Sequence, residues 1–144
     1  MPEDPFRLQR FVDAQEGIYE KALGELRSGR KQTHWMWFVF PQLDGLGRSS
    51  TARFYAIRHA GEAAAYLQHP KLGPRLVECC EAILAIQGKT AREIFGFPDE
   101  LKLRSCATLF SALSPLDSVF TRVIARYFEA GSDRQTLELL RTGA

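Results

Sequence analysis

Apolar residues recur at spacings of three and four along most of the chain, which is the period of an α-helix with one buried face. The pattern is clearest in one stripe made of Val119, Phe120, Val123, Ile124, Tyr127 and Phe128. Only residues 34–40 have the unbroken apolar character of a buried strand, and a lone strand would have no partner to pair with. The periodicity therefore predicts an all-α protein.

Helix start and stop signals divide this pattern into about eight short to medium helices. Asp4-Pro5 predicts the first start, and Gly17 predicts a break before a helix that ends near Gly29. Thr90 followed three residues later by Glu93 is a capping box. Further caps are predicted at Ser49 or Ser50, Asp99, Ser114 and Ser132. With no repeat, linker or low-complexity run, we expect one compact helical domain over residues 1–144.

Residues 34–42 (HWMWFVFPQ) are the most aromatic part of the chain, and Pro41 must end any helix there. A helix that is apolar on nearly every side is buried on nearly every side, so we expect Trp37 and Phe38 in the core. A buried indole N–H or imidazole needs a hydrogen-bond partner. The surroundings of His34, Trp35 and Trp37 are therefore the first place to look for a site.

The composition excludes several classes of function. The chain has 144 residues, of which 45% are hydrophobic and 25% charged, as in a folded globular protein. Lys+Arg 19 against Asp+Glu 17 leaves a net charge of +2, too small for an electrostatic nucleic-acid binder. No apolar run approaches the roughly 20 residues of a membrane span, and the N-terminus lacks a signal-peptide pattern. We expect a cytoplasmic protein that binds neither nucleic acid nor membrane.

The cysteines and histidines predict neither disulfides nor a metal site. Cys79 and Cys80 are adjacent and Cys106 is alone, so no disulfide framework is indicated. The three histidines are scattered and lack the spacing of a metal cage. We therefore expect buried thiols on helices, no metal and no cofactor.

Four blocks of the sequence carry a resemblance to a known family. They are DPFRLQRFVDAQ, THWMWFVFPQLDGLGRSS, AAAYLQHPKLGPRL and DELKLRSCATLF, of which HWMWF-x-FPQ and LKLRS-x-x-TLF are the most distinctive. Over essentially its whole length the chain resembles an uncharacterised, mostly bacterial family, labelled domain of unknown function 1810 and sometimes mis-titled calpastatin. The resemblance implies a multihelical single-domain protein and brings no activity, cofactor or catalytic residue.

Two segments near the aromatic block carry residues suited to chemistry. His34 is a candidate acid or base, with a satisfied core histidine as the alternative. Residues 45–50 (GLGRSS) precede a predicted helix, where exposed N–H groups favour an anion that Arg48 or Arg53 would hold. The segment is not a P-loop, because it lacks the Lys-Ser/Thr ending, and a plain turn capped by Ser49 is the alternative.

A third candidate segment lies near the start of a later helix. Lys102 and Arg104 are cations in a place where the helix dipole disfavours positive charge, and Ser105 follows them. Either a bound anion or an acidic side chain such as Glu16, Asp44 or Glu62 would offset Lys102. A solvated face is the alternative for Arg104.

Two functions therefore stay open. In the first, the protein is an enzyme or receptor that binds, with or without turnover, a small anionic, nucleotide-like molecule. Its catalytic candidates are His34 and Lys102, and its ligand-binding candidates are Trp35, Trp37, Gln42, Arg48, Ser49, Arg53, Tyr55, Arg104 and Ser105. In the second, the aromatics are core and the protein is a non-catalytic helical protein-interaction module. Convergence of His34, Arg53, Tyr55 and Lys102 on one pocket would favour the first.

Overall fold

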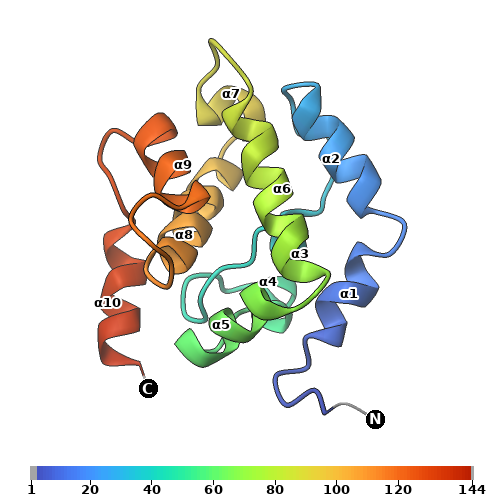
Figure 1. Ribbon diagram of the computed structural model, residues 1–144, viewed down its shortest axis with the longest axis vertical. Coiled ribbons are helices and arrows are strands. Elements are labelled where there is room, and N and C mark those ends of the chain that lie inside the picture. Colours follow the sequence, from blue (N-terminus) through green and yellow to red (C-terminus); the bar gives the residue numbers. More distant parts are fainter. Residues whose placement is uncertain (1–2, 144) are drawn as a thin grey trace.

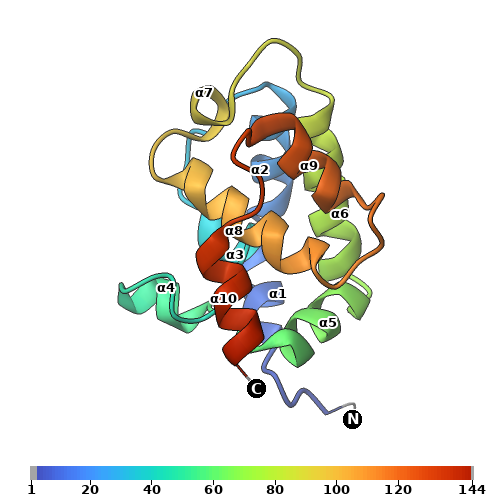
Figure 2. The same cartoon turned by 90° about the vertical axis from the view of Figure 1, so that its left-hand side faces the viewer.

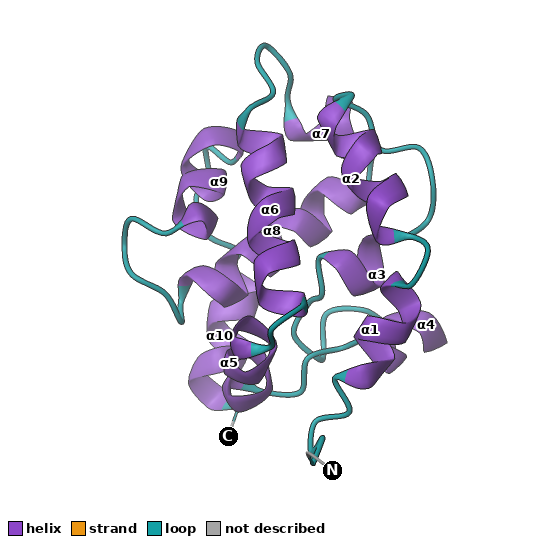
Figure 3. Ribbon diagram, turned by 45° about the vertical axis from the view of Figure 1, so that its right-hand side comes forward, coloured by secondary structure: helices purple, strands orange, loops and turns teal. Residues whose placement is uncertain are grey.

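The structure, a computed structural model, describes residues 3–143. Within that range the chain forms ten helices and no β-strand (Figures 1 and 3). Six helices have nine residues or more: α2 (Tyr19–Arg27), α5 (Ala60–Gln68), α6 (Leu72–Leu84), α8 (Asp99–Ser111), α9 (Val119–Tyr127) and α10 (Arg134–Thr142). The shorter ones are α1 (Gln9–Gln15), α3 (Met36–Val39), α4 (Ser50–Phe54) and α7 (Ala91–Phe95). The all-α prediction is confirmed, with ten helices in residues 3–143 instead of about eight.

The core lies where α6, α8 and α9 pack together (Figure 1). Residues 105–110 of α8 are buried without interruption, so this helix is enclosed on nearly every side. The predicted stripe of α9 buries Val119, Phe120, Val123 and Ile124. None of the helices in residues 3–143 is long and apolar enough to cross a membrane.

The three cysteines are free and buried in this core, as expected. Burial disfavours the thiolate and raises the pKa of Cys79 to about 12. The same cause raises the pKa values of Cys80 and Cys106 well above their ordinary range. All three side chains are therefore protonated packing groups at neutral pH.

Local signals account for several helix ends. Gly17 has a φ of 71°, a left-handed conformation that glycine adopts without steric penalty, and it separates α1 from α2. The capping box is present: Glu93 N donates to Thr90 Oγ1 at 3.1 Å, and Thr90 N donates to Glu93 Oε1 at 2.8 Å. Ser49 caps α4 by accepting from Ala52 N at 3.1 Å.

Two predicted serine caps are displaced along the chain, one by four residues and the other by one. Ser118, not Ser114, caps α9, and Asp133, not Ser132, caps α10. In both places a second short polar side chain lies closer to the helix. Local propensity cannot choose between such neighbours, because the start of the helix is set by the packing of its apolar face.

The segments before and after α4 are irregular and are bonded to each other. An isolated parallel bridge joins Leu43 to Ile57, with Asp44 N donating to Ile57 O at 2.7 Å and Ile57 N to Gln42 O at 2.8 Å. These bonds close a loop whose outer part is α4, and none of the residues of α4 is buried. Figure 2 shows α4 projecting from the side of the molecule. This projection brings the end of α4 beside α1.

Candidate functional site

The first tryptophan of the aromatic block is part of a closed hydrogen-bonded corner. Trp35 is 0% exposed, and its Nε1 donates to Glu25 Oε1 at 2.9 Å. The same carboxylate accepts from Gln32 N at 2.7 Å, Thr33 N at 3.0 Å and Thr33 Oγ1 at 2.6 Å. We call these four residues the Glu25 corner. It leaves no ring face of Trp35 open to a ligand, contrary to the expectation that Trp35 stacks one.

The hydrogen bonds of the Glu25 corner stabilise its charge. Burial disfavours the ionised carboxylate, but the bonds from Thr33, Gln32 and Trp35 outweigh it and lower the pKa of Glu25 from 4.5 to about 2. The folded state therefore holds Glu25 ionised at neutral pH. This charge orders residues 32–35 and is a structural device.

His34 lies on the solvent side of the Glu25 corner. The turn at residues 32–35 keeps His34 outside α3, which begins only at Met36, and its side chain is exposed. The expected position of His34 among aromatics is therefore wrong. It lines neither of the two cavities described next.

Four of the sequence candidates meet at one small depression. Trp37, Gln42, Tyr55 and Lys102 line it together, from three different parts of the chain. Lys102 Nζ lies 4.9 Å from the centroid of the Trp37 ring, a cation–π contact. The depression has a volume of about 20 Å³, enough for about one water molecule. In this form it does not hold a nucleotide-sized ligand.

Lys102, the cation near the start of α8, is offset by an acidic side chain. This is the alternative to a bound anion that the sequence left open. The acid is Asp99, rather than any of the three acids considered from the sequence. Its Oδ1 lies 3.2 Å from Lys102 Nζ and its Oδ2 lies 2.8 Å from Lys31 Nζ. Asp99 was expected to cap α8; instead it is the first residue of the helix and makes no side-chain cap. Two lysines hold its carboxylate away from the helix amides.

Trp37 and Phe38 are half-buried, whereas the sequence predicts that both are largely buried. With only four residues, α3 packs against α1 on one side and leaves its other sides partly open. The Phe38 ring lies 5.4 Å from the Tyr55 ring, centroid to centroid. The aromatic block is thus divided between core and surface.

The remaining candidates are held by the fold or exposed. Arg104 donates from Nε to Gly131 O at 2.7 Å and from Nη2 to Ser132 O at 3.0 Å. Ser105 Oγ donates to the carbonyl four residues earlier at 3.1 Å. Arg48 and Arg53 are exposed and line neither cavity, and Ser49 serves as the cap of α4.

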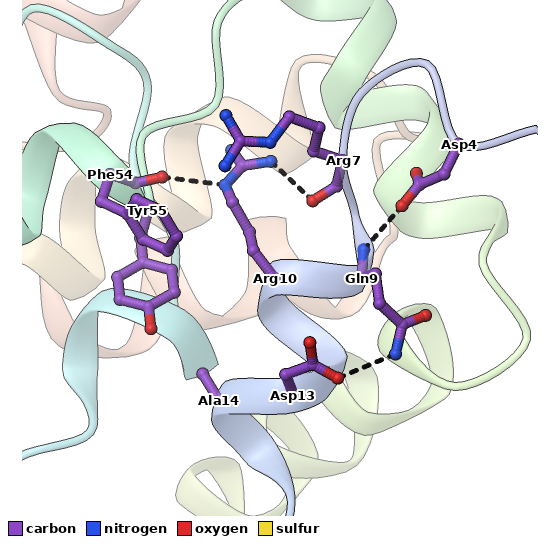
Figure 4. Close-up of a pocket in the computed structure, with 8 residues that line it drawn as sticks. All are labelled: Asp4, Arg7, Gln9, Arg10, Asp13, Ala14, Phe54 and Tyr55. Atoms are coloured by element: carbon purple, nitrogen blue, oxygen red, sulfur yellow. Dashed lines mark hydrogen bonds between the residues drawn. The ribbon is translucent and has the colours of Figure 1, made fainter.

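A larger cavity lies on the other side of Tyr55, between α1 and the end of α4 (Figure 4). We call it the α1–α4 groove. Its volume is about 580 Å³, which is the size of a small-molecule site. The groove is lined by Asp4, Arg7, Gln9, Arg10, Asp13, Ala14, Phe54 and Tyr55. Of these, only Tyr55 was a candidate from the sequence.

Arg10 forms the back of the groove and has no N–H donor left for a ligand. Its Nε donates to Phe54 O at 2.8 Å, and its Nη2 donates to Ala56 O at 2.9 Å and Glu62 Oε2 at 2.8 Å. Its Nη1 donates to two carbonyls of the N-terminal turn at 2.6 and 3.0 Å. A guanidinium has five N–H groups, so every one is bonded. Arg10 is therefore a structural clamp between α1, α4 and α5.

Arg7 differs from Arg10 in the bonding of its side chain and in its backbone conformation. Within residues 3–143 its guanidinium has no hydrogen-bond or ion-pair partner. It lies 5.7 Å from the centroid of the Phe54 ring, which is 46% exposed. Its φ is 54°, a left-handed conformation that is unfavourable for a residue with a Cβ. The fold holds an available cation in a strained backbone at the edge of the groove.

The polar groups of the groove are arranged around one opening. In Figure 4, Arg7 is at the top, Phe54 and Tyr55 are at the left and Asp13 is at the bottom. The Asp13 carboxylate accepts from Gln9 Nε2 at 2.9 Å through one oxygen. The groove therefore has a cationic end at Arg7, a ring face at Phe54 and an acceptor end at Asp13.

Comparison with known proteins places the chain in a family. The family described as "Protein of unknown function (DUF1810)" matches residues 5–140. The chain belongs to the DUF1810 family. The crystal structure of the conserved hypothetical protein Rv1873 from Mycobacterium tuberculosis is similar to it, at 51% identity and a TM-score of 0.94. That match covers 96% of this chain and 99% of the other, and no curated protein matches the chain.

The DUF1810 match confirms the resemblance seen in the sequence, and it includes every residue of the groove except Asp4. Sequence reasoning missed this site because Asp4-Pro5 indicates the start of a regular helix, which would place Arg7 on an ordinary first turn. The adjacent aromatics Phe54 and Tyr55 at the end of α4, of which Phe54 is exposed, were the signal available. A single helical turn with two adjacent aromatics cannot bury both.

Proposed function

We propose that this DUF1810 protein binds a small anionic, nucleotide-like molecule in the α1–α4 groove. The observation that carries the proposal is the Arg7 guanidinium, which has no polar partner within residues 3–143, beside the exposed Phe54 ring. A guanidinium presents a planar fork of donors that matches the oxygens of a phosphate or carboxylate. An exposed aromatic face next to it offers a surface on which a ring can stack.

The two ends of the groove favour different parts of one ligand. At the Arg7 end an acidic group gains charge-assisted hydrogen bonds. At the Asp13 end the carboxylate accepts from hydroxyl or amino groups, as carboxylates do for the ribose hydroxyls of bound nucleotides. The nearby acid Asp4 does not oppose an anion strongly, because its two oxygens accept from Leu8 N at 2.8 Å and Gln9 N at 2.9 Å.

Binding, rather than turnover, is the function that these contacts support. The two acid–base candidates, His34 and Lys102, lie outside the groove. The Tyr55 hydroxyl and the Asp13 carboxylate suffice to orient a ligand. We also propose a cytoplasmic location, which three free and buried thiols favour, because unpaired cysteines are usual in a reducing compartment.

A thermal-shift and calorimetric screen with nucleoside monophosphates and sugar phosphates tests the proposal. A ligand that binds only the folded state raises its stability by about 2.7 kcal/mol at one hundred times its Kd. We expect at least one nucleotide to raise the Tm, and Arg7→Met to abolish that rise. The control is Arg53→Met, which removes an exposed arginine of α4 that does not line the groove. No shift with any nucleotide, or equal loss in both variants, contradicts the proposal.

The second candidate function is that of a helical protein-interaction module. Phe97, two residues before α8, is 66% exposed, and Leu101, in the first turn of α8, is 47% exposed. Adjacent exposed apolar side chains are typical of interaction surfaces. If this surface mediates self-association, the sedimentation coefficient of the protein falls in the double variant Phe97→Ser/Leu101→Ser.

A further inference from the structure

A second cavity adjoins the α1–α4 groove at Arg10. Its volume is about 330 Å³, and it shares both Arg7 and Arg10 with the groove. Arg58, His59 and Glu62 form its other side. We call this cavity the basic recess. Because Arg7 borders both cavities, one ligand can contact it from the groove and extend into the recess.

One cation of the basic recess, Arg10, is already compensated by an acidic side chain. Arg10 and Glu62 form a buried pair at 2.8 Å, with side chains 8% and 2% exposed. The second Glu62 oxygen accepts from Arg58 N at 3.2 Å. The Glu62 carboxylate is thus bonded on both oxygens and adds little negative potential to the recess.

Two cations in the recess are not compensated. The guanidinium groups of Arg7 and Arg58 have no ion-pair or hydrogen-bond partner within residues 3–143. Two like charges that border one cavity repel each other, and an anion between them relieves the repulsion. The recess therefore has the charge of a phosphate site, and no group of the described part of the chain neutralises it.

His59 adds a second ring nitrogen, Nε2, to the same wall. Its Nδ1 accepts from Glu62 N at 3.3 Å and thereby caps α5. In the neutral ring that bond places the proton on Nε2, which becomes a donor. The Phe6 ring meets the imidazole edge-on, with centroids 5.5 Å apart, and holds its orientation.

We infer that the basic recess binds a second phosphoryl group, so that the ligand class is a nucleoside diphosphate or another ring-bearing diphosphate. The ring lies on Phe54, the first phosphoryl group contacts Arg7, and the second lies between Arg7 and Arg58. Arg10, whose donors are all used, separates the two cavities and contributes no contact of its own. This inference rests on the proposed function for the ring and the first phosphoryl group, whereas the Arg58 contact is independent of it.

Isothermal titration calorimetry with ADP, AMP and inorganic pyrophosphate tests the second phosphoryl site separately from the ring site of the proposed function. We expect the unmodified protein to bind ADP at least about tenfold more tightly than AMP, equivalent to about 1.4 kcal/mol. Arg58→Met should remove this preference and leave the Kd for AMP within about twofold. Arg7→Met should weaken the binding of both ADP and AMP, because Arg7 borders both cavities. Arg53→Met is again the matched control, and the Tm of each variant reports its folding.

The possible outcomes distinguish failure of the second phosphoryl site from failure of the proposed function. If AMP binds and ADP binds no more tightly, or if Arg58→Met keeps the preference, the second phosphoryl site is wrong and the proposed function stands. If AMP fails to bind while pyrophosphate binds in a way that Arg58→Met abolishes, the recess is supported and the ring site is wrong. If none of the three probes binds, both ideas are wrong.

Discussion

The Glu25 corner and the α1–α4 groove combine the same kinds of residue with opposite results. In the corner, Glu25, Thr33 and the buried Trp35 use their polar atoms on one another. In the groove, Arg7 and Phe54 are in contact but remain open to solvent. The corner can only stabilise the fold, while the groove keeps groups that a ligand can use.

The same contrast holds between two arginines of the groove, Arg7 and Arg10. Arg10 and Arg7 lie three residues apart and border the same groove. Arg10 donates five hydrogen bonds to the protein, and the guanidinium of Arg7 donates none within residues 3–143. The two residues are of the same type and lie close together in the sequence. They differ in how many of their N–H donors the protein itself binds, and only Arg7 keeps donors that a ligand could use.

The largest expected effect lies in the corner. Trp35→Ala should lower the free energy of unfolding by about 3–5 kcal/mol, because it truncates a fully buried aromatic side chain. Phe54→Ala, in the groove, should change it by less than about 1 kcal/mol, because that ring is 46% exposed. Urea denaturation followed by far-UV circular dichroism measures both. Equal losses would mean that the groove is as closed as the corner.

The charge of Glu25 gives the next largest effect, and its sign depends on pH. A pKa lowered from 4.5 to about 2 in the folded state corresponds to about 3 kcal/mol of stability at neutral pH. This contribution is present above pH 4.5 and is lost as the pH falls toward 2. Glu25→Gln should thus be destabilised by about 2–3 kcal/mol at pH 7, with a difference that shrinks below pH 4.5. Denaturation curves from pH 7 to pH 2.5 measure it, with the exposed Glu16→Gln as control.

A smaller effect is expected at Lys102, which lies between the two regions. Lys102→Met should cost less than about 1 kcal/mol, because Asp99 keeps Lys31 at 2.8 Å and both Asp99 and Lys102 are partly exposed. The double variant Lys31→Met/Lys102→Met leaves Asp99 without a cation and should be clearly less stable. Thermal unfolding of the three proteins checks this. A loss of several kcal/mol in the single variant would show that Lys31 does not compensate.

The smallest effect is expected at Arg7 and concerns its backbone. Arg7→Gly removes the strain of a left-handed φ, so it should be more stable than Arg7→Ala by about 0.5–1 kcal/mol. Neither variant should be much less stable than the original protein, because the side chain makes no polar bond within the described residues. Chemical denaturation compares the two variants. A strong loss in Arg7→Gly would mean that the Arg7 side chain has a structural role.

The sequence by itself determined the features that depend on neighbours along the chain. The helical period, the break at Gly17, the Thr90–Glu93 capping box and the buried stripe of α9 are all present in the structure. Each depends on side chains within about one or two helical turns, so periodicity and capping preferences suffice to predict it. The membership of the DUF1810 family was also visible in the sequence motifs.

Only the tertiary structure decided which polar groups are used and which remain available. Trp35 is closed by a residue ten positions earlier, and Arg10 is held by Glu62, 52 positions later. Lys102 lies in the depression with Trp37 because α8 packs near α3, while Arg53 and His34 point into solvent. Hydrogen bonds between distant segments leave no trace in local periodicity, because they are selected by the packing of the whole core. That the Arg7 guanidinium has no polar partner among residues 3–143 is therefore a property of the folded protein and not of its local sequence.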